Sequence, residues 1–253
     1  MIENKFSEFV DIVKKLRAEC PWDKEQTNDS IKAATIEEAY EVVESIDNKD
    51  YVELKKELGD LLFHIVFHSV MAEELNEFKL EEVIDSIREK LIRRHPHVFG
   101  ETVVNGSEEV KKNWETIKLD EGRESVLEGV PENLPSLQRA HRLQEKAAKV
   151  GFDWEKKEDV WKKVIEEIEE MHQSEREETK EELENEIGDV FFALVNYARF
   201  LNVNPEYALR KTNKKFINRF NYIEKKIQET GRKINESNLQ EMDKYWEESK
   251  SKV

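Results

Sequence analysis

Apolar residues recur along most of the chain at the three- and four-residue spacing of amphipathic helices, and no segment alternates convincingly in the manner of a strand. Capping residues and Gly or Pro mark the expected helix ends, and Asn28, Asp29 or Ser30 is expected to cap the second helix. The pattern predicts an all-α protein. Its helices are expected near residues 3–19, 30–46, 50–76, 79–94, 107–118, 136–149, 156–173, 176–201, 205–229 and 238–250.

The second half of the chain repeats the first. The motif EEAYE at 37–41 is followed by ELGD at 57–60, and EEIEE at 166–170 is followed by EIGD at 186–189, at the same internal spacing. Between the halves, residues 119–136 hold two Gly, two Pro and little periodicity, as a linker would. We therefore expect two tandem helical-bundle domains that arose by duplication. Their expected bounds are 1–120 and 136–253, with a linker at 121–135.

Composition narrows the class of protein and of partner. The chain is 38% hydrophobic and 39% charged with only 8 Gly and 5 Pro, which favours long, solvated helices. A formal net charge of −16 argues against a DNA or RNA polymer as partner, but not against a small anion that arrives with a divalent metal. No apolar run is long enough for a membrane span, and the first residues do not resemble a signal peptide. The single cysteine, Cys20, fits a reducing compartment, so we expect a cytoplasmic protein.

The repeated acidic motifs indicate a metal site. On a helix, Glu37, Glu38 and Glu41 fall within a narrow arc, and Glu57 and Asp60 project together from the next helix. Carboxylates gathered this closely repel one another unless cations or protons neutralise them, and all-oxygen ligands suit Mg²⁺, with Mn²⁺ possible. A single E-E-x-x-E motif would be weak support in a chain with 57 acidic residues, but here the whole set recurs. The apolar stripe expected beside the pair consists of Leu54, Leu58, Leu61 and Ile65.

A di-iron carboxylate bundle is the nearest rival metal site. Such sites use Glu-x-x-His motifs on paired helices, and neither repeat supplies one. His64 lies one turn after Asp60, but Ala193 occupies the matching place in the second repeat. We therefore interpret His64 as a supporting or purely structural residue and not as a ligand.

Each repeat also places cations and a tryptophan at matching positions. Lys and Arg can bind phosphate oxygens, and Trp can stack on a base. Taken singly, these residues are better explained as helix-end cations that pair with surface acids and as core tryptophans. Beside a Mg²⁺ pocket, they indicate a nucleotide polyphosphate site. The residues are Lys90, Arg94, Trp114 and Lys118 in the first repeat, and Lys215, Arg219, Trp246 and Lys250 in the second.

Six further blocks of sequence follow one another along the chain. They are CPWDKEQT (20–27), EEAYEVVE (37–44), ELGDLLFHIVFH (57–68), RRHPHVFG (93–100), KAAKVGFDW (146–154) and EIGDVFFALVN (186–196). In this order they resemble the MazG family of nucleoside triphosphate pyrophosphohydrolases over essentially the whole chain. The resemblance implies an all-α NTP pyrophosphatase fold in tandem, a Mg²⁺ cluster, a homodimer and the reaction NTP + H₂O → NMP + diphosphate with broad base tolerance. It also implies a role in nucleotide-pool control or in the removal of damaged nucleotides.

The resemblance also assigns roles to individual residues. Glu37 and Glu166 would orient or deprotonate the attacking water. Lys163 would contact nucleotide in the second repeat, whereas Ala34 stands at that place in the first. The implied metal ligands are Glu38, Glu41, Glu57 and Asp60, and Glu167, Glu170, Glu186 and Asp189. The other implied substrate contacts are Lys215, Arg219, Trp246 and Lys250 in the second repeat, and Lys90, Arg93, Arg94, Trp114 and Lys118 in the first.

Two alternatives remain open at this point. One is a narrower pyrophosphatase of the same fold that acts on dUTP or phosphoribosyl-ATP. The other is a non-catalytic helical module that regulates a partner or mediates dimerisation, although both carboxylate sets are complete. Attack at the α-phosphorus comes from the resemblance, because the spacing alone does not exclude cleavage of the β–γ bond.

Overall fold

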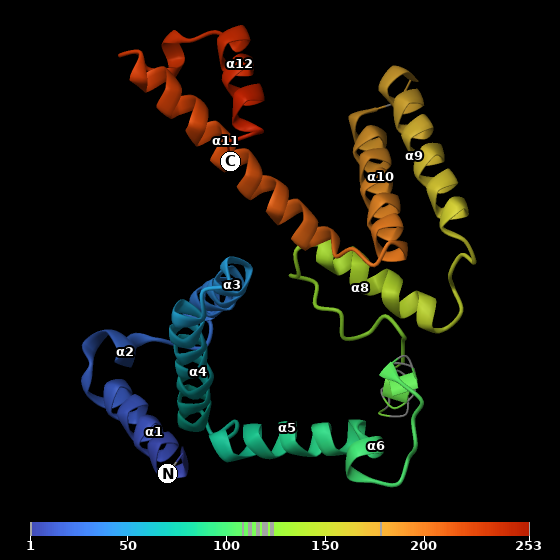
Figure 1. The fold of residues 1–253 in the computed structure, drawn as a ribbon. Coiled ribbons are helices and arrows are strands. Elements are labelled where there is room, and N and C mark those ends of the chain that lie inside the picture. Colours follow the sequence, from blue (N-terminus) through green and yellow to red (C-terminus); the bar gives the residue numbers. More distant parts are fainter. Residues whose placement is uncertain are drawn as a thin grey trace. The chain divides into compact units, whose positions relative to one another are not determined.

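The computed structural model describes residues 2–107, 109–110, 113–114, 117, 121, 124–177 and 179–252, and this part of the chain is helical without strands (Figure 1). The all-α prediction is therefore confirmed. The helices are α1 (Ile2–Glu19), α2 (Pro21–Glu25), α3 (Lys32–Asn48), α4 (Tyr51–Glu74), α5 (Leu80–Arg94), α6 (Pro96–Phe99), α8 (Ser136–Lys149), α9 (Lys157–Glu177), α10 (Lys180–Phe200), α11 (Pro205–Glu229), the 3₁₀ helix η1 (Ile234–Glu236) and α12 (Leu239–Ser249).

The chain divides into two compact units, Met1–Asn105 and Gly106–Val253. This division does not test the expected domain ends at 120 and 136, which stay predictions. The helix expected near 107–118 has several of its residues outside the described part of the chain, including Lys118.

In the first unit, α3 and α4 form a hairpin that positions the acidic motifs side by side. Lys49 adopts left-handed backbone (φ 56°) after α3, and the Asp50 carboxylate then caps α4 by accepting from the amides of Val52 and Glu53. Helix α1 packs against α4. The core between them consists of Val13, Ile31, Val66, Phe67, Val70 and Met71.

The second unit repeats this hairpin with α9 and α10. Thr179 begins α10 with a capping box, in which its hydroxyl and amide pair with Glu182. Helix α8 packs across α10, as α1 does on α4 in the first unit. Helix α11 begins beside α8 and α10, extends away from them, and carries α12 packed along its other half (Figure 1).

Two local predictions are wrong. The first turn of α3 has no side-chain cap, because Ile31 occupies the N-cap, while the side chains of Thr27 and Ser30 bond within their own turn. The expected apolar stripe of α4 does not all face the core either, since Leu58 and Ile65 are 51% and 45% exposed. Helices α1 and α3 cover only part of α4, so the rest of its apolar surface stays open.

Candidate functional site

The first repeat brings three predicted ligands together. Glu38 and Glu41 on α3 and Glu57 on α4 each offer a carboxylate oxygen, and these oxygens lie within 4.8 Å of one another. Asp60 is close enough to Glu38 to repel its charge, although it is not a member of this tight group. Glu37 is exposed on α3 beside the cluster. The hairpin thus gathers the carboxylates as the helical spacing predicts.

Burial and repulsion make this cluster hold protons. Burial raises the pKa of Glu57 to about 7, and hydrogen bonds with the carboxylates of Glu41 and Glu53 contribute in the same direction. The pKa of Glu38 is also raised, first by burial and then by the charges of Glu41 and Asp60. A cation would displace these protons and neutralise the cluster, which is the behaviour expected of a metal site.

A buried polar network supports Glu38 from behind. The Thr35 hydroxyl lies 2.9 Å from both His64 Nδ1 and His68 Nε2, and His64 Nε2 lies 3.9 Å from Glu38 Oε1. The Asn28 side-chain amide donates to the His68 carbonyl and contacts His68 Nδ1, both at 3.2 Å. Burial lowers the pKa of His68, which keeps this ring neutral. His64 therefore lies behind a predicted ligand, as a supporting residue would.

The second repeat forms its own cluster from Glu167 on α9 and Glu186 and Asp189 on α10, whose oxygens again lie within 4.8 Å of one another. Glu167 is buried in this cluster, whereas Glu57 is the buried member of the first. Burial and the charge of Glu167 raise the pKa of Glu170, which lies beside the group.

Lys163 distinguishes the second cluster from the first. Its ammonium lies 2.6 Å from Glu166 Oε1 and 2.8 Å from Glu167 Oε1. These two hydrogen bonds raise the pKa of Lys163, so the side chain stays charged. The matching residue of the first repeat is Ala34, which offers no cation. The two clusters therefore differ in local charge, and also in membership, since Glu41 belongs to the first group whereas Asp189 belongs to the second.

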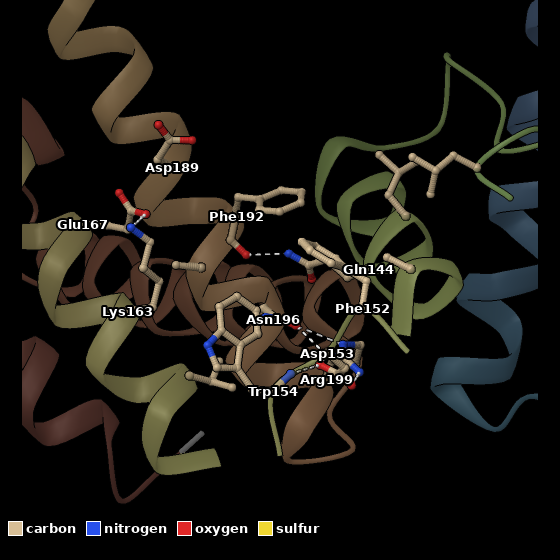
Figure 2. A pocket seen from close by; sticks show the side chains of 15 residues that line it. Gln144, Phe152, Asp153, Trp154, Lys163, Glu167, Asp189, Phe192, Asn196 and Arg199 are labelled. Carbon is tan, nitrogen blue, oxygen red and sulfur yellow. Dashed lines mark hydrogen bonds and ion pairs between the residues drawn. The ribbon is translucent and has the colours of Figure 1, made fainter. Parts of the chain in front are cut away.

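A cavity of about 450 Å³ adjoins the second cluster (Figure 2). Lys163, Glu167 and Asp189 line one part of it, and apolar side chains from α8, α10 and the loop before α9 line the rest. Pockets of this size hold small molecules such as a nucleoside. The remaining lining includes Leu143, Gln144, Phe152, Trp154, Phe192 and Ala193.

Hydrogen bonds fix the wall of the cavity. Arg199 binds both carboxylate oxygens of Asp153, at 2.9 and 2.5 Å, and also donates to Asn196 Oδ1 (Figure 2). The Gln144 amide donates to the Phe192 carbonyl at 2.8 Å and joins α8 to α10. The cavity is thus held by side chains that are themselves fixed.

Apart from Lys163, the predicted substrate-binding residues in the described part of the chain lie on other helices than the carboxylates. Lys163 pairs with Glu167 of the second cluster. Lys90, Arg93 and Arg94 lie on α5, Lys215 and Arg219 on α11, Trp246 on α12 and Lys250 just after it, where it pairs with Glu247 at 2.5 Å. Trp114 belongs to the second compact unit and Lys118 lies outside the described residues.

Sequence reasoning did not single out the cavity wall. Phe192, Asn196 and Arg199 follow EIGD on one face of α10. Their spacing is typical of any helix face that packs against a neighbour, so it does not indicate a cavity. Trp154 ends the block KAAKVGFDW that carries the family resemblance, but no role for it follows from that. Apolar lining residues carry no distinctive spacing, and only the packing of α8 shows that they surround a space.

The donor sets fit a hard divalent cation. Each cluster offers carboxylate oxygens alone, which suits Mg²⁺ or Mn²⁺ better than a softer metal. In the first cluster, burial first and neighbouring carboxylates second raise the pKa values of Glu38 and Glu57. No helix among the described residues is both long and apolar enough to cross a bilayer.

Known proteins are similar to this chain over nearly its whole length. The MazG nucleotide pyrophosphohydrolase domain matches twice, at residues 26–99 and 155–224. The nucleoside triphosphate pyrophosphohydrolase/pyrophosphatase MazG of Thermotoga maritima is 43% identical over 97% of this chain and 95% of its own. The nucleoside triphosphate pyrophosphohydrolase of Escherichia coli is 40% identical over 98% of this chain and 97% of its own. YabN of Bacillus subtilis is 45% identical over 99% of this chain and 52% of its own length. With both carboxylate hairpins inside the matched residues, the chain belongs to the MazG nucleotide pyrophosphohydrolase family.

Proposed function

We propose that this protein is a nucleoside triphosphate pyrophosphohydrolase that converts an NTP and water to an NMP and diphosphate, with Mg²⁺ and with broad base tolerance. The observation that carries this proposal is the second carboxylate cluster, which opens into a cavity large enough for a nucleoside. Two nearly full-length relatives, from T. maritima and E. coli, bear the same activity in their names. A role in nucleotide-pool control and a cytoplasmic location accord with this activity.

The residues present divide the work of the reaction. Glu167, Glu186 and Asp189 would hold Mg²⁺, which when bound offsets polyphosphate charge and makes water a better nucleophile. Glu166 has a side chain 55% exposed beside the cluster, so it can accept a proton from the attacking water. Lys163 lies next to both glutamates and can bind a phosphate oxygen as charge moves onto the leaving diphosphate.

The cavity supports the proposal of broad base tolerance. Apolar and aromatic side chains such as Trp154, Phe152 and Phe192 contact a nucleoside by its faces, which every base possesses. A pocket that recognises base edges would instead need several free polar groups. Arg199 is already bound to Asp153 and to Asn196 Oδ1, and in the described lining Gln144 Oε1 is a buried acceptor without a partner. A dUTP- or phosphoribosyl-ATP-specific enzyme would require such recognition, so this wall favours the broader reading.

Product analysis tests the reaction. Incubating the protein with ATP, GTP, dUTP or phosphoribosyl-ATP and Mg²⁺, and following ³¹P NMR, should show the monophosphate and diphosphate from several NTPs. Chelation of divalent metal should abolish turnover. Nucleoside diphosphate with orthophosphate as first products would contradict cleavage at the α-phosphorus, and activity confined to one substrate would favour the narrower enzyme.

Variants of the carboxylates test the site. In a four-site variant, Glu38, Glu41, Glu167 and Glu170 are all replaced by Gln. Its turnover should fall by roughly several orders of magnitude, because metal would no longer activate the attacking water. The matched control replaces Glu158 and Glu181, exposed acids of α9 and α10, by Gln and should keep normal turnover. If the four-site variant stays folded and active, the clusters are ordinary surface acids and the proposed function is wrong.

A further inference from the structure

The cavity beside the second cluster contains a buried hydrogen-bond acceptor that no described residue uses. Gln144 lies on α8, its side chain lines the cavity, and only 7% of the residue is exposed. Its amide nitrogen donates to the Phe192 carbonyl at 2.8 Å (Figure 2). Among the described residues, none donates to Gln144 Oε1, which is buried. Buried polar atoms are nearly always paired, so this oxygen marks a place where a bound molecule supplies the donor.

The Phe192 carbonyl fixes which end of the Gln144 amide is left for a ligand. A backbone carbonyl only accepts hydrogen bonds, so the amide nitrogen must face it and the amide oxygen must face elsewhere. Turning the amide over would place two acceptors against each other. Gln144 therefore offers the cavity a fixed acceptor, which pairs with an N–H or O–H group and repels a carbonyl oxygen or a ring-nitrogen lone pair.

This acceptor lies at the end of the cavity that is farther from the carboxylates. Phe192 follows Asp189 by three residues on α10, and the carbonyls of a helix point toward its C-terminus. The Phe192 carbonyl and the Gln144 amide bound to it therefore lie about one helical turn, roughly 5 Å, beyond Asp189. With the phosphates of an NTP at the carboxylates, this end receives the base. Phe152 and Trp154, which can stack on a base, line the same cavity.

We propose that Gln144 is a specificity-determining residue, whose side-chain oxygen accepts a hydrogen bond from an N–H group on the edge of the nucleobase. Adenine and cytosine carry such a group as an exocyclic amine, guanine as an amine and a ring N–H, and uracil as a ring N–H. A single acceptor thus suits every common base and selects against a base whose edge has lost its N–H. This inference rests on the proposed function, since it places the nucleoside of the substrate in this cavity.

A sugar hydroxyl is the other donor that a nucleotide brings, so the test has a base arm and a sugar arm. The base arm compares ATP with purine riboside triphosphate, which lacks the 6-amino group and adds no bulk. CTP and pyrimidin-2-one riboside triphosphate make the same comparison for a pyrimidine. The sugar arm compares ATP with its 2′-deoxy and 3′-deoxy forms.

The protein variants isolate the second repeat and the acceptor. All proteins carry Glu38→Gln and Glu41→Gln, so that turnover comes from the second repeat, and these two changes define the parent. Gln144→Met removes the acceptor and keeps the length of the side chain. Gln138→Met is the matched control, because it makes the same exchange on α8 at a residue that does not line the cavity.

The measured quantity is the ratio of kcat/KM between the two members of each pair. In the parent and in Gln138→Met, the base-arm ratio should favour the amino nucleotide by about tenfold or more, because the analogue leaves Gln144 Oε1 unpaired. In Gln144→Met, this ratio should fall to near one. A defect of packing alone would lower the turnover of both members alike and leave the ratio unchanged, so the ratio reports recognition.

Several results would overturn the inference. A base-arm ratio near one in the parent would do so, as would a ratio that persists in Gln144→Met. A flat base arm together with a sugar-arm ratio that Gln144→Met abolishes would assign the acceptor to a hydroxyl. If circular dichroism shows that Gln144→Met is unfolded, Gln144→Leu takes its place in the same comparison.

Binding separates this inference from the proposed function. If the parent hydrolyses no NTP, the proposed function fails. Calorimetry with Mn²⁺ then compares the affinities of AMP and purine riboside monophosphate for the parent and Gln144→Met. A preference for AMP that Gln144→Met removes would support the role of Gln144, whereas equal affinities in the parent, or no binding of either nucleotide, would overturn it.

Discussion

Metal binding by the first cluster should depend steeply on pH, because Glu57 must lose a proton to act as a ligand. Burial, with hydrogen bonds from Glu41 and Glu53, raises its pKa to about 7. A carboxyl group with this pKa is roughly one tenth ionised at pH 6 and nine tenths ionised at pH 8. The apparent Mn²⁺ affinity of the cluster should therefore rise about tenfold over this range from Glu57 alone. Glu38, whose pKa is raised as well, adds to the change in the same direction.

The same proton sets the pH dependence of stability without metal. The folded protein binds a proton at Glu57 between about pH 4.5 and 7 that the unfolded chain has released. Since the folded state binds more protons there, the free energy of unfolding of this hairpin should fall as pH rises through that window. Glu57→Gln should flatten the dependence, because it keeps the hydrogen bonds and removes the charge.

Electron paramagnetic resonance of Mn²⁺ can follow the first cluster alone in a protein with Glu167→Gln and Glu170→Gln. Affinities measured from pH 6 to pH 8 should show the rise, and the added Glu57→Gln change should give weaker binding with a smaller slope. An affinity that does not vary with pH, or a slope that Glu57→Gln leaves intact, would refute the assignment of the proton to Glu57.

Three further outcomes are expected. Ala193→Leu, which fills the cavity, should raise KM for ATP by roughly tenfold and leave Mn²⁺ affinity unchanged; an unchanged KM would place the nucleoside elsewhere. Phe67→Ala, in the fully buried core of the first unit, should cost about 3–5 kcal/mol in denaturant unfolding, and a loss below about 1 kcal/mol would contradict the described packing. Asp153→Asn should destabilise the second unit by about 1–3 kcal/mol, because it removes the partly buried pair with Arg199; a chemical denaturation curve that does not shift would show that the pair contributes nothing.

The helices and both carboxylate clusters could be predicted from sequence because their signals are local. Glu38 and Glu41 share a helix face by spacing alone, and the same spacing recurs at Glu167 and Glu170, of which Glu167 belongs to the second cluster. The short helices α2 and α6 were not expected, because segments of four or five residues show no periodicity.

The cap of α3 and the cavity could not be predicted. Asn28 is an ordinary capping residue by type, but its amide binds His68, forty residues away, and sequence does not reveal that competition. The cavity depends on how α8 crosses α10, so its lining is set by tertiary packing. Leu58 and Ile65 are largely exposed, because a spacing pattern marks the apolar face of a helix without showing whether another element covers it.

The network behind Glu38 fixes which nitrogen of His68 carries the proton. Because the Asn28 amide nitrogen donates to the His68 carbonyl, it also faces His68 Nδ1 as a donor, which leaves the His68 proton on Nε2. That proton goes to the Thr35 hydroxyl, whose own proton has two acceptors within reach, the Ile31 carbonyl at 3.1 Å and His64 Nδ1 at 2.9 Å. The other nitrogen of the His64 ring, Nε2, faces Glu38 Oε1 at 3.9 Å. The corresponding carboxylate of the second repeat, Glu167, meets the Lys163 ammonium instead. Equivalent carboxylates thus meet an imidazole in one half of the chain and an ammonium in the other, so we expect the two halves to hold metal with different strengths.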